Sequence, residues 1–425
     1  MKISEKMFIY GTLLIYFLLP FERVPTFELF GFTIKLSYLA FLVFALIFLR
    51  LLFKNWQRFP FDLSDYGLMA LWLAGGLSVV FSPDKQRSII VLLMWAFVFL
   101  FYLIFSRILK DPRIRQRVER VILISSVLVA LFGIYQFIGD SLNLPISLTF
   151  LRLQYTKVVL GFPRIQSVAL EPLYFSNFLL IPLFIAVKRY LLNKSLFNKY
   201  LPVMVLFLID IILGISRGAY LALIVGFLLV FVLLFIKGLK EKTYWQQGFL
   251  VFASIFFSAL FSLSLVFIFN GSSAFRNFSG HASVDDTKTG SSVPGRIEAY
   301  KLAWKLFKEK PFFGNGVASF GILTAGTPEE IERFGYGIVN NEYLEILAET
   351  GVLGLFSVLF FLGFFFYEGF RSYKRGDSKK KITLILSLSG LAALAVQYNF
   401  FSTLYIIYIW AFLALVRGEI YDQAD

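Results

Sequence analysis

The amino-acid sequence predicts an all-α integral membrane protein with about 12 transmembrane helices and one large external loop. Two features of its composition lead to this fold class: 58% of the 425 residues are hydrophobic, and 53 residues are phenylalanine. A soluble domain of this length cannot bury so much apolar surface, so the bilayer has to act as its solvent. The third observation is that the apolar residues are gathered into separate runs, which are joined by polar or charged segments.

A helix needs roughly 20 residues to cross a bilayer, and several of these runs are shorter than that, so the boundaries of individual spans are approximate. The first run lacks the small-x-small pattern of a signal-peptide cleavage site, so we interpret it as a retained span. No internal repeat is visible, and we expect residues 1–425 to form a single polytopic domain. Transmembrane helices are expected at residues 7–20, 36–53, 66–81, 88–105, 118–138, 172–187, 201–215, 219–236, 249–269, 344–367, 382–396 and 403–416.

Basic residues predict the orientation of the spans, because Lys- and Arg-rich loops remain in the cytoplasm. Alternate loops carry such clusters, at residues 50–58, 107–117, 188–199, 237–242 and 371–381. The expected location is therefore the cell inner membrane, with both termini cytoplasmic and with loops 139–171 and 270–341 on the extracytoplasmic side. Because ATP and nucleotide sugars are absent there, chemistry in these loops has to use another activated substrate.

The composition also excludes several kinds of site. The chain has no cysteine and one histidine, which excludes disulfides, thiol catalysis and metal sites built from several His ligands. Asp285 and Asp286 are adjacent rather than spaced as Asp-x-Asp, so we expect no metal and no cofactor. The net charge of +14 is explained by loops that flank spans, and nucleic acid is not an expected partner.

The external interval 270–341 is expected to contain an amphipathic helix at residues 294–310, while its Ser/Gly-rich part, 271–292, is expected to be a mobile cover or tether. At about 100° per residue, Arg296 lies within roughly 40° of an apolar stripe, and the helix lysines point to the opposite side. Two interpretations remain open: an arginine that extends from a membrane-surface helix, or an arginine turned inward over an anion. The stripe consists of Tyr300, Ala303 and Phe307.

A second candidate, Arg217, interrupts an apolar stretch, 201–235, that is too long for one span, so we expect it at an external hairpin. Glycines on either side, Gly214 and Gly218, allow close approach of backbone or ligand. The alternative is an interfacial arginine that contacts lipid headgroups. Asp210, two helical turns earlier, is either a buried partner of Arg217 or a structural residue.

Two carboxylates stand where helices are expected to begin. Glu171 precedes Pro172, which suits the first turn of the sixth span, and a carboxylate there either caps the helix or takes part in chemistry. Glu342 stands at the corresponding place before the run 344–367, where it complements the helix dipole. Arg164 is either a loop charge or a further ligand. Because arginine binds phosphate bidentately and keeps its charge, these residues indicate an external site for a diphosphate.

Several segments match motifs of a known family. The sequence Ser-Arg-Gly-Ala-Tyr-Leu-Ala-Leu at 216–223 is one of them, and Arg296 with Trp304, followed by Lys-Pro-Phe-Phe-Gly-Asn-Gly at 310–316, is the second. The third is Asn-Asn-Glu-Tyr-Leu at 340–344 with Glu-Thr-Gly-Val-Leu-Gly at 349–354. In this order around one external loop, the motifs resemble those of the O-antigen ligase/polymerase superfamily of bacterial inner-membrane glycosyltransferases.

The resemblance implies a GT-C-like membrane enzyme that uses a glycan linked to a polyprenyl diphosphate such as undecaprenyl diphosphate, without metal or nucleotide. A glycan or lipid acceptor and membrane lipid follow as partners, and a chain-length regulator protein is a further candidate partner. Arg217 and Arg296 match the two essential arginines of the family, which engage the donor diphosphate. The further substrate-binding candidates are Arg164, Asn340, Asn341 and Tyr343.

The resemblance fails at one position. The ligase branch has a histidine where this chain has Asn340, and asparagine cannot act as a general base. A carboxylate is then the expected base, with Glu171 as the first candidate and Glu342 as the second. The Arg-x6-Glu-Pro sequence at 164–172 resembles polymerase-type members of the superfamily more than ligases, and this resemblance implies an inverting glycan polymerase rather than an O-antigen ligase. A transporter or flippase with about 12 spans is the alternative from another class.

Overall fold

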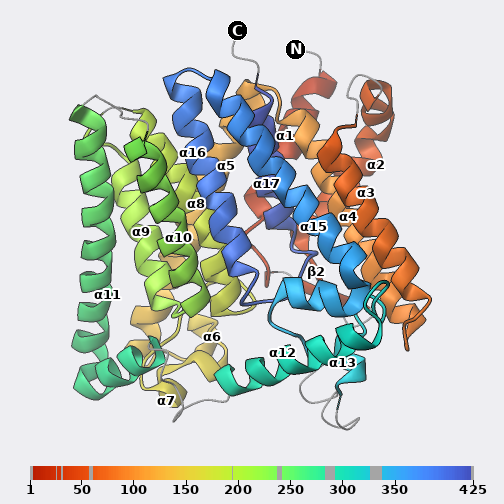
Figure 1. The fold of residues 1–425 in the computed structure, drawn as a ribbon. Helices are drawn as coiled ribbons and strands as arrows, with labels where there is room; N and C mark the ends of the chain where they lie inside the picture. Colours follow the sequence, from red (N-terminus) through yellow and green to blue (C-terminus); the bar gives the residue numbers. More distant parts are fainter. Residues whose placement is uncertain are drawn as a thin grey trace.

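The computed structural model describes residues 3–24, 26–29, 32–56, 61–193, 195–236, 242–282, 292–325 and 337–422. Long helices run side by side in one bundle, and short helices gather at one of its ends (Figure 1). Seven described helices are long and apolar enough to cross a membrane, and three shorter apolar helices accompany them. The prediction of an all-α polytopic membrane protein is confirmed.

The predicted apolar runs fall on the long helices of the bundle. In chain order these helices are α1 (Ile3–Leu18), α2 (Leu36–Trp56), α3 (Leu63–Val79), α4 (Lys85–Ile108), α5 (Pro112–Ser141), α8 (Pro172–Leu192), α9 (Tyr200–Leu213), α10 (Arg217–Ile236), α11 (Lys242–Ala282), α15 (Glu342–Arg375), α16 (Ser378–Gln397) and α17 (Ile407–Ile420). The amphipathic helix α12 (Ser292–Glu309) lies across one end of the bundle. The short elements are the antiparallel strands β1 (Thr26–Leu29) and β2 (Phe32–Lys35), then α6 (Ile146–Thr149), η1 (Leu153–Tyr155), α7 (Lys157–Leu160) and α13 (Phe320–Leu323).

Aspartate and asparagine side chains set the first residue of several helices. Each accepts a hydrogen bond from a backbone N–H of the first turn, which has no partner within the helix. At α3 the arrangement is a reciprocal capping box. Because these caps lie in the polar connections, they mark where each apolar run becomes helical. The capping residues are Asp62, Asp84, Asp111, Asn341 and Asp377.

Helix α17 lies at the centre of the bundle, and all of its residues are buried. It packs against α4, while α8 and α10 pack on α16, and α15 packs on α3. Helix α11 stands at the edge (Figure 1) and exposes phenylalanines such as Phe249 and Phe256. Exposed aromatic residues on the outer helices fit a lipid environment, whereas in water they would form an unstable surface.

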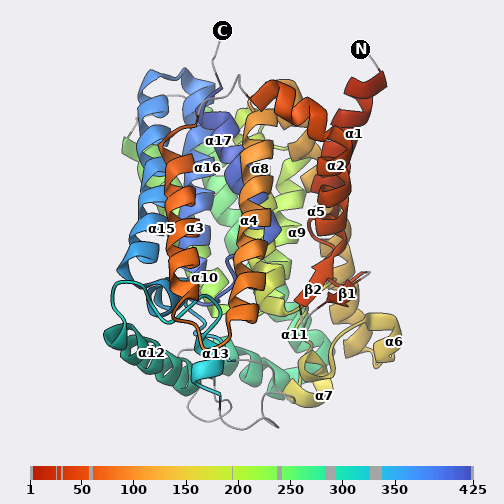
Figure 2. The same cartoon turned by 90° about the vertical axis from the view of Figure 1, so that its right-hand side faces the viewer.

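The two ends of the bundle differ. Helix α1 begins and α17 ends at the same end, and α6, α7, α12 and α13 cover the opposite end (Figures 1 and 2). We call the latter the α12 end. The expectation that both termini lie on one side of the membrane agrees with this arrangement.

Buried ion pairs connect the helices near the termini. Arg417 on α17 pairs with Asp65 on α3 at 2.6 Å, and Lys188 on α8 pairs with Glu119 on α5 at 3.0 Å. Glu419 on α17 also pairs with Lys188. Because removing one partner of a buried pair leaves an uncompensated charge, these contacts hold α17 to both sides of the bundle.

One expectation about the external interval is wrong. Residues 271–292 were expected to be a mobile tether, but α11 continues to Ala282 after a break at Gly271, whose φ is 82°. Beyond this break Phe278 is buried, and its ring packs on Phe162 at 5.4 Å. Tertiary contact therefore overrides the Ser/Gly-rich composition. Residues 283–291, with Asp285 and Asp286, lie outside the described part of the chain.

Candidate active site

The α9–α10 connection is a tight hairpin at the α12 end, and Arg217 is the first residue of α10. Its two glycines are required by close packing. A Cβ at Gly214 would lie 2.6 Å from Oγ of Ser176, and a Cβ at Gly218 would lie 2.7 Å from Cγ of Phe400. Both distances are far below ordinary contact, so the hairpin can approach its neighbours only because these side chains are absent.

Side chains from outside α9 donate to carbonyl groups at the C-terminal end of α9 and in the hairpin that follows it. Arg164 donates from Nε to the carbonyl of Gly214 and from Nη2 to that of Ile215, both at 2.8 Å. The Tyr220 hydroxyl donates to the carbonyl of Ile212 at 2.6 Å. Ile215 has a φ of 45°, and a β-branched residue in this left-handed region carries a strain of about 1–3 kcal/mol.

Glu171 occupies the N-cap position of α8, but its side chain makes no capping hydrogen bond. The structure therefore does not support the interpretation of Glu171 as a simple helix cap. The side chain is half-buried, and burial raises the pKa of Glu171. The positive charges of Arg152, Arg164 and Arg296 act in the opposite direction. Glu171 thus stands among cations and has no capping contact to hold it.

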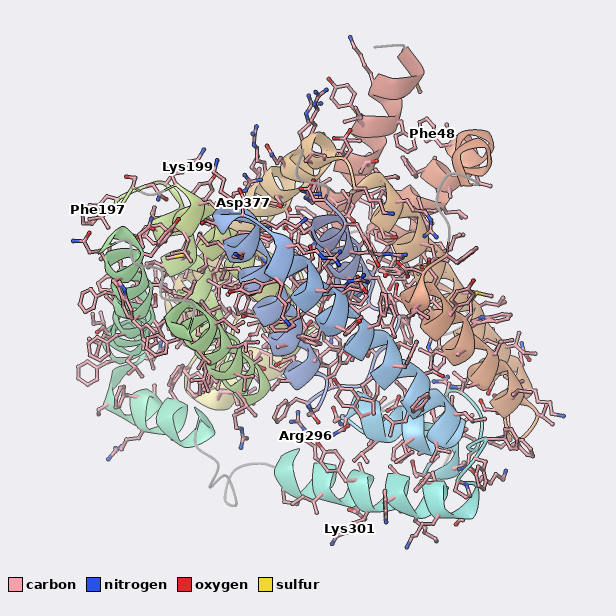
Figure 3. All side chains as sticks on the ribbon, turned by 45° about the horizontal axis from the view of Figure 1, so that its top comes forward. Phe48, Phe197, Lys199, Arg296, Lys301 and Asp377 are labelled. Carbon is pink, nitrogen blue, oxygen red and sulfur yellow. The ribbon has the colours of Figure 1, made fainter. Side chains whose placement is uncertain are left out.

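Helix α12 carries Arg296 to the site. The helix lies across the α12 end, where Arg296 points toward the bundle and Lys301 points away from it (Figure 3). On the inner face Ala303 is buried, and the Tyr300 hydroxyl donates to the carbonyl of Asn399 at 3.1 Å. The amphipathic helix expected at residues 294–310 is thus present, with the arginine on the face that packs against the bundle.

Arg164 and Arg296 lie near enough to act on Glu171, and Arg217 lies near enough to act on both of these arginines. Burial lowers the pKa of Arg164 and of Arg296, and the charge of Arg217 lowers both further, whereas Glu171 raises both. These side chains come from the loop before α8, from the N-cap position of α8, from α10 and from α12. All four are half-buried, so they retain contact with solvent. The result is a partly open, positively charged cluster that contains one carboxylate.

Residues 340–343, at the start of α15, make contacts that mainly hold the backbone and the neighbouring helices in place. Asn340 has a φ of 58°, a conformation that asparagine tolerates better than most residues, and its carbonyl accepts from the Tyr300 hydroxyl at 3.4 Å. The Asn341 side chain accepts from the backbone N–H of the third residue of α15. The Tyr343 hydroxyl donates to a carbonyl of α16 at 2.8 Å. Asn340 thus stands beside the inner face of α12, whereas Tyr343 is held by α16.

Glu342 is not part of the arginine cluster. It lines a separate cavity together with Glu345, Glu349 and Arg87. Its nearest charges are the other two glutamates, and its Oε2 has no hydrogen-bond partner among the described residues. The structure therefore separates the two carboxylates that the sequence offered as bases.

The suggested pairing of Asp210 with Arg217 is not found. Asp210 is fully buried in α9, and neither of its carboxylate oxygens has a hydrogen-bond partner among the described residues. A Cβ at Gly133 on α5 would lie 2.6 Å from its Oδ1, so the carboxyl group points toward α5. Asp210 lies in the last turn of α9, just before the hairpin, and its side chain does not join the cluster.

Sequence reasoning missed two residues beside Glu171. Arg152 acts on the charge of Glu171, and it lies in a loop that carries no helical or motif signal. Glu22 is buried, forms an ion pair with Lys35 and accepts from the backbone N–H of Leu170 at 3.3 Å. Because Glu22 and Leu170 lie far apart in the chain, only the folded structure brings them together.

No group of three or more His, Cys, Asp or Glu side chains in the described part of the chain has an arrangement that could hold a metal ion. The charged groups in and around the cluster are the guanidinium groups of arginines and the carboxylates of glutamates. Guanidinium groups bind oxyanions bidentately, so the chemical class of ligand that fits this cluster is a phosphate or diphosphate.

The comparison with known families agrees with the motifs. A family model described as O-antigen ligase matches residues 202–359, a segment that runs from α9 into α15. It contains Arg217, Arg296 and the segment 340–344, whereas Arg164 and Glu171 precede it. No curated protein matches the chain. In this multi-pass membrane protein, the match at residues 202–359 supports the resemblance to the O-antigen ligase/polymerase superfamily.

Proposed function

We propose that the protein is an extracytoplasmic glycosyltransferase that polymerises oligosaccharide repeat units carried on a polyprenyl diphosphate. The observation that carries the proposal is the convergence of Arg217 and Arg296 with one carboxylate, Glu171, at the end of the bundle opposite the termini. The basic loops predict that the termini are cytoplasmic, which supports an extracytoplasmic position for this end. The match of residues 202–359 to the O-antigen ligase family supports lipid-linked glycans as the class of substrate.

In this proposal Arg217 and Arg296 bind the donor diphosphate. Negative charge grows on the diphosphate as its bond to the anomeric carbon breaks, and two guanidinium groups already in place stabilise that charge. They supply the neutralisation that a divalent cation supplies in many phosphate-handling enzymes. The products are the extended glycan and a polyprenyl diphosphate.

Glu171 acts as the general base. The acceptor hydroxyl attacks the anomeric carbon from the face opposite the diphosphate, which inverts the configuration, and Glu171 takes the hydroxyl proton. A base works best when its pKa approaches the working pH, and burial raises the pKa of Glu171 in that direction. The absence of a capping hydrogen bond leaves the carboxylate available for this role.

Ligase activity is the second candidate, because the family model that matches residues 202–359 is described as O-antigen ligase. A ligase transfers a finished glycan to a lipid or protein acceptor and does not build a chain. Among the substrate-binding candidates, Asn340 and Asn341 lie beside the inner face of α12, where an acceptor would approach Arg296.

A single experiment separates the candidates. Purified full-length protein in detergent is given lipid-linked single repeat units, and the products are resolved by size. A ladder of chain lengths supports the polymerase. Transfer only to an added lipid or protein acceptor supports the ligase. Absence of any new glycosidic bond with either kind of acceptor contradicts both, and it leaves a transporter or flippase as the alternative.

A further inference from the structure

The Arg164 side chain is hydrogen-bonded to the backbone of the α9–α10 hairpin, which is not expected of an arginine whose role is to bind phosphate. Its Nε and Nη2 each donate at 2.8 Å to one of two consecutive carbonyls, those of Gly214 and Ile215. This edge of the guanidinium group is an edge that an arginine uses for a bidentate phosphate contact. In this structure the protein backbone occupies it.

The same two carbonyls lie on either side of the backbone torsion angles of Ile215, where the chain turns from α9 into α10. Ile215 has a φ of 45°, an unfavourable conformation for a β-branched residue, and Arg217 begins α10 two residues later. A strained conformation of this kind persists only where surrounding contacts impose it. Arg164 holds the carbonyl on each side of that φ/ψ pair, and Tyr220 holds the carbonyl of Ile212.

Arg164 is itself held in place. Its backbone N–H donates to the carbonyl of Tyr155 at 2.8 Å, and its guanidinium carbon lies 5.7 Å from the centre of the Tyr155 ring. From Arg164 the chain runs through a segment of mostly buried residues to Glu171 at the start of α8. One side chain therefore connects the segment that carries the carboxylate to the hairpin that carries Arg217.

We propose that Arg164 is a positioning residue that acts through Arg217. By imposing the left-handed turn at Ile215, it sets where the Arg217 guanidinium points and how far it lies from Glu171. This inference rests on the proposed function, in which Arg217 binds the donor diphosphate. A displacement of a catalytic contact by about 1 Å can reduce a rate by about 100-fold, so loss of the tie is expected to be severe.

The first test measures the hairpin directly and does not depend on any enzymatic activity. In the full-length protein, Arg164→Lys keeps the charge but cannot donate from two fixed positions at once. Amide hydrogen exchange at Gly214 and Ile215 is expected to become at least about 10-fold faster. Unchanged exchange at these amides would overturn the proposal.

A milder variant and a matched control complete this test. Tyr220→Phe removes only the hydroxyl that donates to Ile212, and it is expected to accelerate exchange at the same amides. Arg23→Lys changes another arginine that donates to a carbonyl, that of Phe150 at 3.0 Å, but it does not touch the hairpin. Exchange at Gly214 and Ile215 is expected to stay unchanged in Arg23→Lys. Equal acceleration in all three variants would mean a general loosening of the fold and would overturn the inference.

The second test asks whether Arg164 acts through Arg217. In a double-mutant cycle, kcat/KM for glycan transfer is measured for Arg164→Lys, for Arg217→Lys and for both together. A positioning residue loses its effect once the residue that it positions has been changed, so the double variant is expected to be no slower than Arg217→Lys within about 3-fold. Effects that multiply would assign Arg164 an independent contact with substrate and would overturn the proposal.

Failure of the proposed function can be distinguished from failure of this inference. If the wild-type protein transfers no glycan, the cycle is repeated on the binding of a polyprenyl diphosphate, and the exchange experiment still decides whether Arg164 holds the hairpin. Arg23→Lys serves again as the control, and its effect is expected to multiply with that of Arg217→Lys. Arg164 loses the proposed role if its effect multiplies in the same way.

Discussion

Burial lowers the pKa of Arg296 on α12, and the charge of Arg217 at the start of α10 lowers it further. The two arginines come from different elements, and the connection between these elements includes the whole of α11. The two arginines repel each other but stay close, because Arg217 is fixed at the start of α10 and Arg296 is carried by α12, which packs against the bundle. A bound dianion would relieve this repulsion, and the first prediction follows from that relationship.

Arg217→Ala and Arg296→Ala are each expected to reduce glycan transfer by at least about 100-fold, because each removes charge stabilisation from the leaving diphosphate. The measurement is initial rate with lipid-linked repeat units, with size-exclusion chromatography to show that the variant is folded. Lys301→Ala is the matched control, since Lys301 lies on the same helix and points away from the bundle (Figure 3). Near-normal product from both arginine variants would contradict the diphosphate clamp.

The rate is expected to depend on pH through Glu171. A general base acts only when it is deprotonated, and burial raises the pKa of Glu171 above its ordinary value, against the opposing arginine charges. Activity should therefore be lost as the pH falls through this raised pKa and should level off above it. The pH profile of kcat/KM is the measurement. An acidic limb at the ordinary pKa of a glutamate, or no acidic limb, would speak against this assignment.

Glu171→Gln is expected to reduce the rate by about 100-fold or more and to remove the acidic limb. Glu342→Gln is the comparison variant, because Glu342 lies in a separate cavity beside Glu345 and Glu349. It should cost far less activity, since replacing one of three neighbouring carboxylates with a neutral group reduces their repulsion. The reverse ranking of the two variants would reassign the base to Glu342.

Gly218→Ala tests the close approach behind Arg217. The added Cβ would lie 2.7 Å from Cγ of Phe400, so either the ring or α10 has to move. We expect a loss of stability of about 1–3 kcal/mol together with a loss of activity. Gly248→Ala is the control, because a Cβ there meets nothing within 4 Å, and alanine stabilises a helix. Thermal unfolding in detergent compares the two, and equal behaviour would contradict the packing argument.

Arg417→Met tests the buried ion pairs near the termini. It removes one partner from the fully buried Asp65, which keeps Arg107 at 3.1 Å, and it removes the ion-pair partner of Asp62. Breaking a buried pair costs about 3–5 kcal/mol. Adding Asp62→Asn should restore part of the lost stability, because it removes one unbalanced carboxylate and leaves the Arg107–Asp65 pair intact. The measurement is the midpoint of thermal unfolding for the single and double variants. No recovery in the double variant would mean that packing, rather than charge, holds α17 at this position.

Features with a local signal could be predicted from the sequence alone. The apolar runs predicted the long helices, and the interruption by Gly214 to Gly218 predicted the α9–α10 hairpin. Helical periodicity likewise predicted which face of α12 carries Arg296. These predictions hold because bilayer thickness and helix geometry act on neighbouring residues. The Ser/Gly-rich segment after Gly271 is the exception, because its helix depends on the contact of Phe278 with Phe162.

Only the tertiary structure decided which charged residues meet. Glu171 and Glu342 look alike in the sequence, since each stands at the start of a helix, yet one lies among arginines and the other among glutamates. Arg164 reads as an ordinary loop charge, and its two bonds to the hairpin span 50 and 51 residues. The physical reason is that a charge acts through space, and the helix packing that brings distant segments together leaves no mark on the residues beside each charge.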